Sequence, residues 1–150
     1  MIRNVELTDL SQIRYLFEEW ISDKAEIGER IQEISQQTTN YFVAIENDRI
    51  IGIMGTQRLD DEVQQFSSNP EQALEIISAF VSREARGRGI GKSLIGAIEL
   101  EAKQLGYKEI IIWSGPKYKE TGWYFYDSLP GVKRVGFVGS EDFPVWKKNL

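Results

Sequence analysis

The sequence predicts a mixed α/β domain in which helices pack against a sheet of parallel and antiparallel strands. Apolar residues recur at helical spacing in some segments, whereas other segments are short apolar runs typical of strands. These two kinds of segment do not alternate strictly, which excludes a purely parallel sheet. Because 150 residues with 41% hydrophobic content can bury one continuous core, we expect a single domain over residues 1–150.

Local signals place the elements along the chain. Helices are predicted where apolar residues return every three or four positions, and strands where apolar runs are bounded by turn residues. The first half is expected to hold a strand at residues 2–6, a helix from Leu10 capped by Thr8 or Asp9, a second helix after the Asp23–Glu26 capping box, a hairpin of strands 41–45 and 50–54, and a loop or a frayed strand end at 60–72. The second half is expected to hold a strand at 73–81, a helix from Ile90 to Leu105, a strand at 109–113, a short helix within 120–129, and an antiparallel pair at 132–138 and 143–146.

The composition excludes several kinds of site. Cysteine and histidine are both absent, so a disulfide scaffold, a thiolate nucleophile, a Ser-His triad and a Cys- or His-ligated metal are excluded. We expect no metal, and catalysis must rest on carboxylates, hydroxyls, lysine or backbone dipoles. No apolar run approaches the roughly 18 residues of a membrane span, and the start lacks the pattern of a secretory signal.

Charge is unevenly distributed along the chain. Residues 1–75 contain 6 basic and 15 acidic residues, whereas residues 76–150 contain 12 basic and 8 acidic ones. The net charge of −5 argues against a general nucleic-acid binder. The asymmetry favours a C-terminal half that holds an anion and an N-terminal half that admits a cation, unless it is an ordinary drift of surface charge.

The most informative segment is the glycine-rich stretch 80–93, FVSREARGRGIGKS. A predicted strand leads into glycines at 87, 89 and 91, and a long amphipathic helix follows. Glycines let backbone N–H groups converge on one point, and the positive end of the helix dipole adds to them, which together make a phosphate site. Residues 83–92 include four basic residues and one acidic residue, which suits an anion. A solvated basic loop that caps a helix is the alternative.

Two nucleotide-binding patterns fit this turn poorly. Its glycine spacing departs from the G-x-G-x-x-G of dinucleotide folds. Arg86 replaces the first glycine of the P-loop pattern, and the later strand at 110–113 offers no acidic residue for a magnesium ion.

The turn and its surroundings resemble the GNAT-type N-acetyltransferases. The family signature, [QR]-x-x-G-x-[GA] between a strand and a helix, is matched by Arg86, Gly89 and Gly91. The family's lead-in is matched by Phe80-Val81 and by Glu84-Ala85-Arg86-Gly87. The element order agrees too, so the resemblance covers nearly the whole chain. It implies a single-domain GNAT fold with a mixed central β-sheet flanked by helices on both faces.

The resemblance also implies a binding site for acetyl-coenzyme A (acetyl-CoA) as co-substrate. In this family the turn binds the pyrophosphate, and the preceding strand hydrogen-bonds the pantetheine arm. The implied pantetheine contacts come from the backbones of Phe80 and Val81. The implied phosphate site starts at the signature residue Arg86 and continues with the amides of Gly87, Arg88, Gly89, Gly91 and Lys92.

Without histidine, the general base must be a carboxylate, which is expected to act through water, and Glu75 is the first candidate. It lies six residues before Val81, so both face one side of a regular strand. Similar family members often have a glutamate at this position. The alternatives are a solvent-facing Glu75, or an amine pocket lined by the acidic cluster Asp60, Asp61 and Glu62, which could itself be merely solvated.

Tyr126 is the candidate general acid. The segment 122–129 resembles the family's Ala-x-x-Phe-Tyr-x-x-Leu, which places Tyr126 on the tyrosine that faces the coenzyme sulfur in many members. On a helix, Tyr124 lies about 200° from Tyr126, and the face of Phe125 and Leu129 is expected to pack on the sheet. The alternative is an aromatic helix with a packing role only.

One position departs from the family pattern. Many members have Asn seven residues before the tyrosine, where this chain has Lys119. The usual side-chain hydrogen bond to the pantetheine is therefore in doubt. Lys117 and Lys119 could contact coenzyme phosphate instead, or be solvated.

The expected function is transfer of an acetyl group from acetyl-CoA to a primary amine, of a small molecule or a protein, by direct attack. A cationic acceptor is mildly favoured by the acidic N-terminal half. We expect a cytoplasmic protein without nucleic-acid or membrane partners, and the sequence leaves a homodimer open. The alternative function is a non-catalytic coenzyme A-binding sensor or interaction module.

Overall fold

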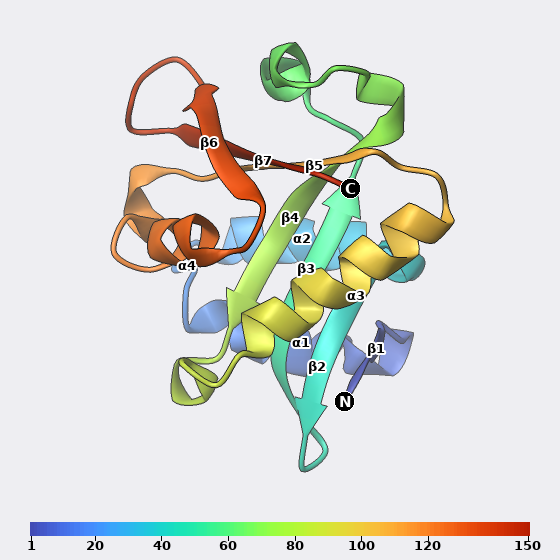
Figure 1. The fold of residues 1–150 in the computed structure, drawn as a ribbon. Coiled ribbons are helices and arrows are strands. Elements are labelled where there is room, and N and C mark those ends of the chain that lie inside the picture. Colours follow the sequence, from blue (N-terminus) through green and yellow to red (C-terminus); the bar gives the residue numbers. More distant parts are fainter. The chain divides into compact units, whose positions relative to one another are not determined.

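Seven strands form a mixed sheet in the computed structural model, which describes residues 1–150 (Figure 1). The chain divides into two compact units. The first comprises Met1–Thr56 and Ile77–Ile98, and the second comprises Gln57–Ile76 and Glu99–Leu150. The strand order is β1-β2-β3-β4 in the first unit and β4-β5-β7-β6 in the second, since β4 belongs to both. The predicted mixed α/β class is confirmed.

The strands of the first unit are antiparallel neighbours. β1 (Ile2–Asn4) pairs with β2 (Tyr41–Glu46), and β2 pairs with β3 (Arg49–Gln57). Between β2 and β3 the chain turns in two residues, Asn47 and Asp48, with φ of 51° and 61°. Two successive positive φ values characterise the hairpin turn whose twist matches that of the strands, and Asn and Asp tolerate it. The predicted hairpin is confirmed.

Helices cover both faces of this part of the sheet. Figure 1 shows α3 (Ile90–Gln104) in front of β2 and β3, with α1 (Leu10–Glu18) and α2 (Lys24–Gln36) behind them. Residues 52–55 of β3 are all buried, which is the pattern of a strand covered on both sides. None of the helices has both the length and the apolarity that crossing a bilayer requires.

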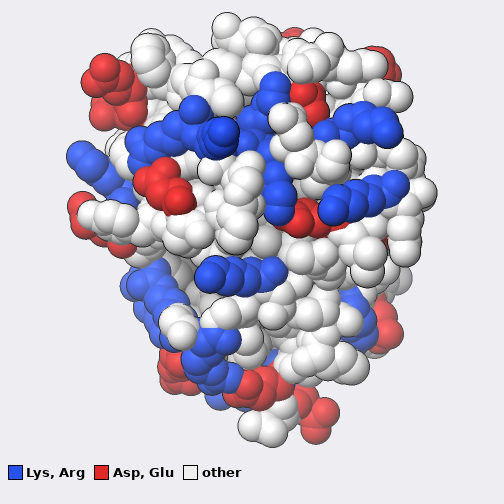
Figure 2. Space-filling view, in the orientation of Figure 1, with Lys and Arg blue, Asp and Glu red and all other residues white.

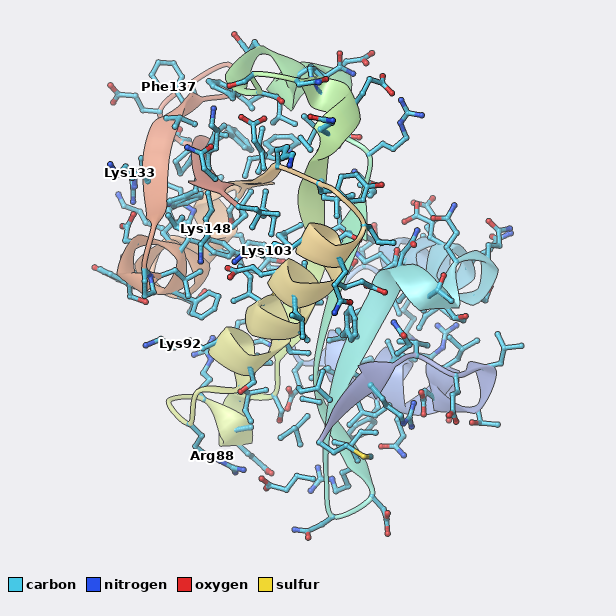
Figure 3. All side chains as sticks on the ribbon, turned by 45° about the vertical axis from the view of Figure 1, so that its right-hand side comes forward. Arg88, Lys92, Lys103, Lys133, Phe137 and Lys148 are labelled. Atoms are coloured by element: carbon cyan, nitrogen blue, oxygen red, sulfur yellow. The ribbon has the colours of Figure 1, made fainter.

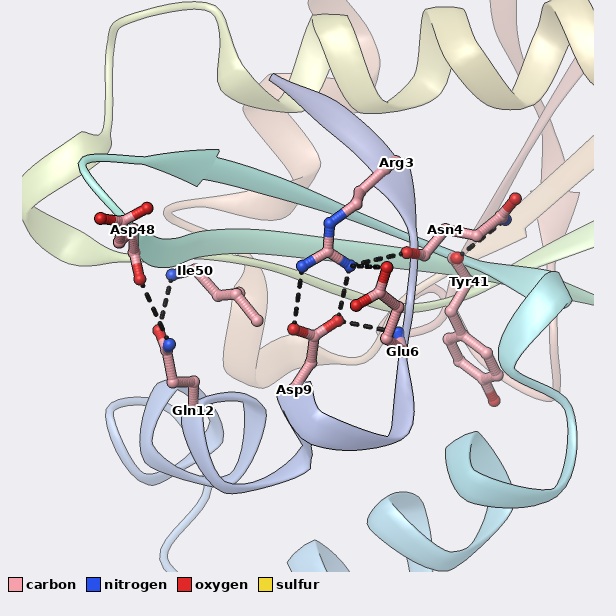
Figure 4. Close-up of polar contacts among 8 residues, drawn as sticks. All are labelled: Arg3, Asn4, Glu6, Asp9, Gln12, Tyr41, Asp48 and Ile50. Atoms are coloured by element: carbon pink, nitrogen blue, oxygen red, sulfur yellow. Dashed lines mark hydrogen bonds and ion pairs between the residues drawn. The ribbon is translucent and has the colours of Figure 1, made fainter.

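The start of the chain is held by one carboxylate (Figure 4). Asp9 accepts two hydrogen bonds from the Arg3 guanidinium, at 2.7 and 3.0 Å, and one from the backbone N–H of Glu6 at 2.8 Å. The Arg3 hydrogen bonds lower the pKa of Asp9. Because this carboxylate is committed to residues before it, it stabilises the 3₁₀ turn that precedes α1 and does not cap α1 itself. The expected capping by Asp9 is corrected accordingly.

The second unit continues the sheet from the first three residues of β4 (Ala73–Val81). They pair in parallel with β5 (Glu109–Trp113), and α3 leads to β5 as the crossover that a parallel pair requires. β7 (Pro144–Asn149) is antiparallel to β5, and β6 (Val132–Phe137) is antiparallel to β7. The predicted bounds of β4 and β5 and the closing antiparallel pair are confirmed.

The short helix α4 (Gly122–Ser128) buries a different face from the expected one. Trp123 and Tyr126, three residues apart, are buried together with Leu129, whereas Phe125 is only half-buried. The reason is Trp146 of β7, whose ring lies 6.4 Å from that of Trp123 and 5.1 Å from that of Tyr126. Packing against the large Trp146 ring therefore buries Trp123 and Tyr126. The prediction that Phe125 belongs to the buried face of α4 is wrong.

A buried glutamate anchors the segment between β3 and β4, which was expected to be a loop and contains two short 3₁₀ turns. Glu109 accepts hydrogen bonds from the Ser67 hydroxyl and from the backbone N–H of Ser68, and its carboxylate lies 3.1 Å from the Lys147 ammonium. Burial opposes ionisation of Glu109, but these donors outweigh it and lower its pKa to about 2. The segment also contains the acidic residues at 60–62, which precede the anchored Ser67 and Ser68.

Candidate active site

The glycine-rich turn lies between β4 and α3 and belongs to the first unit. Gly87 and Gly89 have φ of +74° and +79°, which L side chains rarely adopt, so these backbone conformations require glycine. A Cβ built at either position would meet no atom within 4 Å, so the turn borders open space. The first N–H groups of α3 have no intrahelical acceptor and point out of its start, as an anion site requires.

The basic side chains of the turn are held in different ways. The guanidinium groups of Arg83 and Arg86 each lie 4.3 Å from the centre of the Trp20 ring. Arg88 forms an ion pair with Glu46 at the end of β2. Lys92 is exposed and extends from the first turn of α3 (Figure 3), and Figure 2 shows many basic side chains at the surface. A phosphate at this turn would meet the backbone amides and Lys92.

The end of β4 holds Phe80 and Val81, the two residues expected to contact the pantetheine arm. Phe80 is 7% exposed, and its ring packs edge-on against Phe17 of α1 with centroids 5.3 Å apart. The carbonyl of Val81 accepts a hydrogen bond of 3.1 Å from the Trp20 indole N–H. That carbonyl therefore already has one hydrogen-bond partner within the chain.

The strand β4 is not regular between the two expected sites. Ser78 has φ of 48°, in the left-handed region, which interrupts the alternation of side chains along the strand. The expectation that Glu75 and Val81 face one side assumed a regular strand. That assumption is wrong at Ser78, so the six-residue spacing no longer places the two side chains on one face.

Glu75 is buried in the second unit, with only 2% of its surface exposed. Its Oε1 accepts the backbone N–H of Asp60 at 2.8 Å, and its Oε2 accepts the indole N–H of Trp113 at 3.0 Å and the side-chain amide of Gln57 at 3.3 Å. The alternative of a solvent-facing glutamate is excluded by this burial. Asp60 meets Glu75 through its backbone, and the side chains of Asp61 and Glu62 are exposed.

Burial sets the protonation of Glu75. Loss of hydration raises its pKa from 4.5 to about 7, although the hydrogen bonds from Asp60 and Trp113 favour the ionised form. The negative charge of Asp60 acts in the same direction as burial. A carboxyl group with a pKa near neutrality is matched to general-base work, since about half of it is ionised at pH 7 and the ionised form is basic enough to take a proton.

Gln57 and Trp113 were not anticipated from the sequence. Each is the last residue of its strand, β3 and β5 respectively. The β4–β5 register pairs Glu75 with Ile111, and Trp113 lies two residues further on the same face. Only this register reveals the contact. The one available signal was a single Trp closing the apolar run at 110–113.

Tyr126 and Tyr124 have very different environments. Tyr126 is 8% exposed, whereas Tyr124 is 65% exposed. Burial raises the pKa of the Tyr126 phenol, with a smaller contribution from the nearby Tyr118, so this hydroxyl keeps its proton throughout the physiological range. A protonated phenol can donate to a developing thiolate.

A cavity of about 530 Å³ lies beside α4 in the second unit. The Lys119 ammonium lies over the Trp123 ring at 5.9 Å in its wall, and Asp127 holds Arg134 there through two hydrogen bonds of 2.9 Å. None of the predicted catalytic or coenzyme-binding residues is among those lining it, which are Lys119, Trp123, Tyr124, Asp127, Arg134, Gly136, Phe137, Glu141 and Pro144.

A strand, a glycine turn with left-handed residues and the start of a helix are the elements of a class of proteins that bind phosphorylated ligands at a helix N-terminus. A family model described as "Acetyltransferase (GNAT) family" matches residues 6–128. The chain belongs to the GNAT acetyltransferase family, and the resemblance drawn from Arg86, Gly89 and Gly91 is confirmed.

Individual relatives agree with this assignment. Human N-acetyltransferase 8 is 26% identical over 117 residues, which are 77% of this chain and 46% of that protein, so the match spans about half of the relative. Among solved structures, ribosomal-protein-alanine N-acetyltransferase from Brucella melitensis has a TM-score of 0.76 at 18% identity, covering 100% of this chain and 99% of the other. An acetyltransferase from Salmonella typhimurium, solved with its cofactor acetyl-CoA, has a TM-score of 0.74 at 16% identity, covering 100% and 93%.

Proposed function

We propose that this chain is an acetyl-CoA-dependent N-acetyltransferase that transfers the acetyl group directly to a primary amine. The observation that carries the proposal is Glu75, a buried carboxyl group with a pKa of about 7 in a chain without histidine. Membership of the GNAT family and the glycine turn support acetyl-CoA as the acyl donor. The structurally similar protein from Salmonella typhimurium was solved with its cofactor acetyl-CoA, which supports the same donor.

The proposed coenzyme site is formed by the end of β4 and the turn after it. The pantetheine arm pairs with the backbone of Phe80 and Val81, and the pyrophosphate lies against the turn amides and the start of α3. The residues assigned to the coenzyme are Phe80, Val81, Arg86, Gly87, Arg88, Gly89, Gly91 and Lys92. Open space in front of Gly87 and Gly89 leaves room for phosphate oxygens close to the backbone.

The proposed chemistry is one acyl transfer accompanied by proton transfers at both ends of the reacting bonds. Glu75, through water, takes a proton from the substrate ammonium, and the neutral amine nitrogen then attacks the thioester carbonyl carbon. The C–N bond forms while the C–S bond breaks, and Tyr126 donates its proton to the departing thiolate. The attacking nitrogen gives its second proton to the Tyr126 phenolate, which restores the phenol, and Glu75 releases its proton to solvent. A backbone N–H near Phe80 polarises the thioester oxygen. Direct attack needs no enzyme nucleophile, and the chain has no cysteine to serve as one.

The acceptor is proposed to be a primary amine of a small molecule or a protein, in a cytoplasmic setting. The 15 acidic residues among the first 75 support an amine that arrives as a cation. A protein amine is supported by the likeness to a ribosomal-protein-alanine N-acetyltransferase, and a small amine by the burial of Glu75.

The experiment combines coenzyme binding with thiol release. Acetyl-CoA should bind in the micromolar range by calorimetry, more weakly as salt is added, and free thiol should appear with at least one amine of a panel. Binding without thiol release on any amine would identify the coenzyme A-binding sensor instead.

A pair of variants at one glycine tests the site itself. Gly89→Asp should abolish acetyl-CoA binding while the fold persists, because φ of +79° strains any side chain and the carboxylate repels phosphate. Steric bulk contributes little, since no atom lies within 4 Å of the added Cβ. Gly89→Ala carries the strain without the charge and should weaken binding less. Unchanged affinity in Gly89→Asp would contradict the proposed site.

A further inference from the structure

Two residues just after α1 reach the entrance of the glycine-rich turn, more than 60 positions away. The backbone N–H groups of Glu19 and Trp20 still bond to α1, on the carbonyls of Leu16 and Phe17, at 3.2 and 2.9 Å. Both residues are therefore held by the helix end. The Trp20 indole N–H donates to the Val81 carbonyl at 3.1 Å, at the point where β4 ends.

The Trp20 ring also holds two cations of the turn. The guanidinium groups of Arg83 and Arg86 lie 4.3 Å from its centroid, well within the range of about 6 Å at which a cation is attracted to an aromatic face. Both arginines are exposed and carry like charge, so they repel one another. The indole offsets this repulsion and fixes where both side chains lie.

Glu19 holds the backbone between those points. Its carboxylate accepts the Ser82 hydroxyl at 3.2 Å and the Arg83 backbone N–H at 3.3 Å, and its carbonyl accepts the Arg83 guanidinium at 3.0 Å. Every contact is made on the side of Val81–Arg86 that meets α1. None of these contacts of Glu19 and Trp20 involves the backbone amides of the glycines or of the first turn of α3.

We infer that Trp20, supported by Glu19, is a positioning residue for the phosphate-binding turn. The pair holds the entrance of the turn in its ligand-ready conformation before the coenzyme arrives, so binding costs less ordering of the loop. Trp20 touches neither the thioester nor the amine in this role. The inference rests on the proposed function, because it assigns the turn to the phosphates of coenzyme A.

The test separates the two halves of coenzyme A. The phosphorylated half, 3′-phosphoadenosine 5′-diphosphate, and pantetheine are each titrated as competitors, alongside acetyl-CoA by calorimetry. Trp20→Leu removes the ring and the N–H, and we expect roughly 10-fold weaker binding of acetyl-CoA and of the phosphorylated half. Trp20→Phe keeps a ring and should lose less, about 3-fold. In steady-state kinetics the KM for acetyl-CoA should rise, while kcat and the KM for the amine stay nearly unchanged.

Trp123→Phe is the matched control. Trp123 also donates its indole N–H to a backbone carbonyl, that of Gly115 at 3.0 Å, and it also carries two cations, Lys119 and Arg134, over its ring. Trp123→Phe thus makes the same chemical deletion as Trp20→Phe, at a residue of the second unit. Affinity for the phosphorylated half should not change in Trp123→Phe.

Several results would overturn the inference. Unchanged affinity of Trp20→Leu for the phosphorylated half does so, as does an equal loss for pantetheine or a loss confined to kcat. If Trp20→Leu does not fold, Glu19→Gln gives the second measurement. It weakens the hold on Ser82 and Arg83, and an unaltered KM for acetyl-CoA in that variant counts against the inference. Absence of coenzyme binding in the wild-type protein would instead defeat the proposed function.

Discussion

Substitution of Glu75 by Gln tests the proposed base, because it removes the titrating carboxyl group and nearly preserves its size. The amide oxygen can accept only one of the two hydrogen bonds, from the Asp60 N–H or from the Trp113 indole N–H, and the amide NH2 then faces the other donor. Circular dichroism therefore verifies that Glu75→Gln is folded before its kinetics are measured. If Glu75 takes the proton of the amine, the variant must use the small fraction of amine that is already neutral.

The size of the effect follows from two pKa values. A primary amine with a pKa of about 10 is neutral to roughly one part in 10³ at pH 7, so kcat/KM of Glu75→Gln should fall by about 10³ there. The wild-type kcat/KM should rise with pH up to about 7, where Glu75 becomes ionised, and then level off. The variant should keep rising by about 10-fold per pH unit, so its deficit shrinks to roughly 10-fold at pH 9.

The assay is thiol release under kcat/KM conditions from pH 6 to 9.5, with one amine that the wild-type protein accepts. Glu109→Gln is the matched control, because this second buried glutamate has a pKa of about 2 and is ionised over the whole range. The change of slope near pH 7 should remain in that control. A deficit of Glu75→Gln that stays constant from pH 6 to 9.5 would refute the base assignment and indicate a binding or structural role.

Two further predictions concern the tyrosines of α4 and the buried Glu109, which anchors the segment between β3 and β4. Tyr126→Phe should lower kcat roughly 10- to 10³-fold with coenzyme affinity nearly intact, and Tyr124→Phe should change little; steady-state kinetics that show the reverse order would contradict the assignment. Glu109→Gln should lower the free energy of unfolding by up to about 3 kcal/mol at pH 7, measured by urea denaturation. The pKa of Glu109 is depressed in the folded state, so the ionised carboxylate contributes its full stability above pH 4.5. The difference in unfolding free energy between wild type and Glu109→Gln should therefore narrow as pH falls from 4.5 toward 2. A difference that does not change with pH would contradict this role of the Glu109 charge.

Much of the fold and the coenzyme turn could be predicted because the signals are local. The positive φ values at Asn47 and Asp48, and at Gly87 and Gly89, occur at residue types that tolerate them. The bounds of β4 and β5 follow from apolar runs that end at polar residues. The family signature spans only six consecutive positions, 86–91, all within the turn. The sequence alone was therefore sufficient to indicate the family that the comparisons confirm.

The surroundings of the candidate catalytic residues required the tertiary structure. Trp113 contacts Glu75 because of the register in which β4 pairs with β5. The buried face of α4 is determined by Trp146, which belongs to β7. Trp20 meets the turn across more than 60 residues. The pKa of Glu75 has the same origin, since it depends on how completely segments distant in sequence exclude water from one carboxyl group. Backbone preferences are encoded residue by residue, whereas register, burial and long-range contacts result from packing of the whole chain.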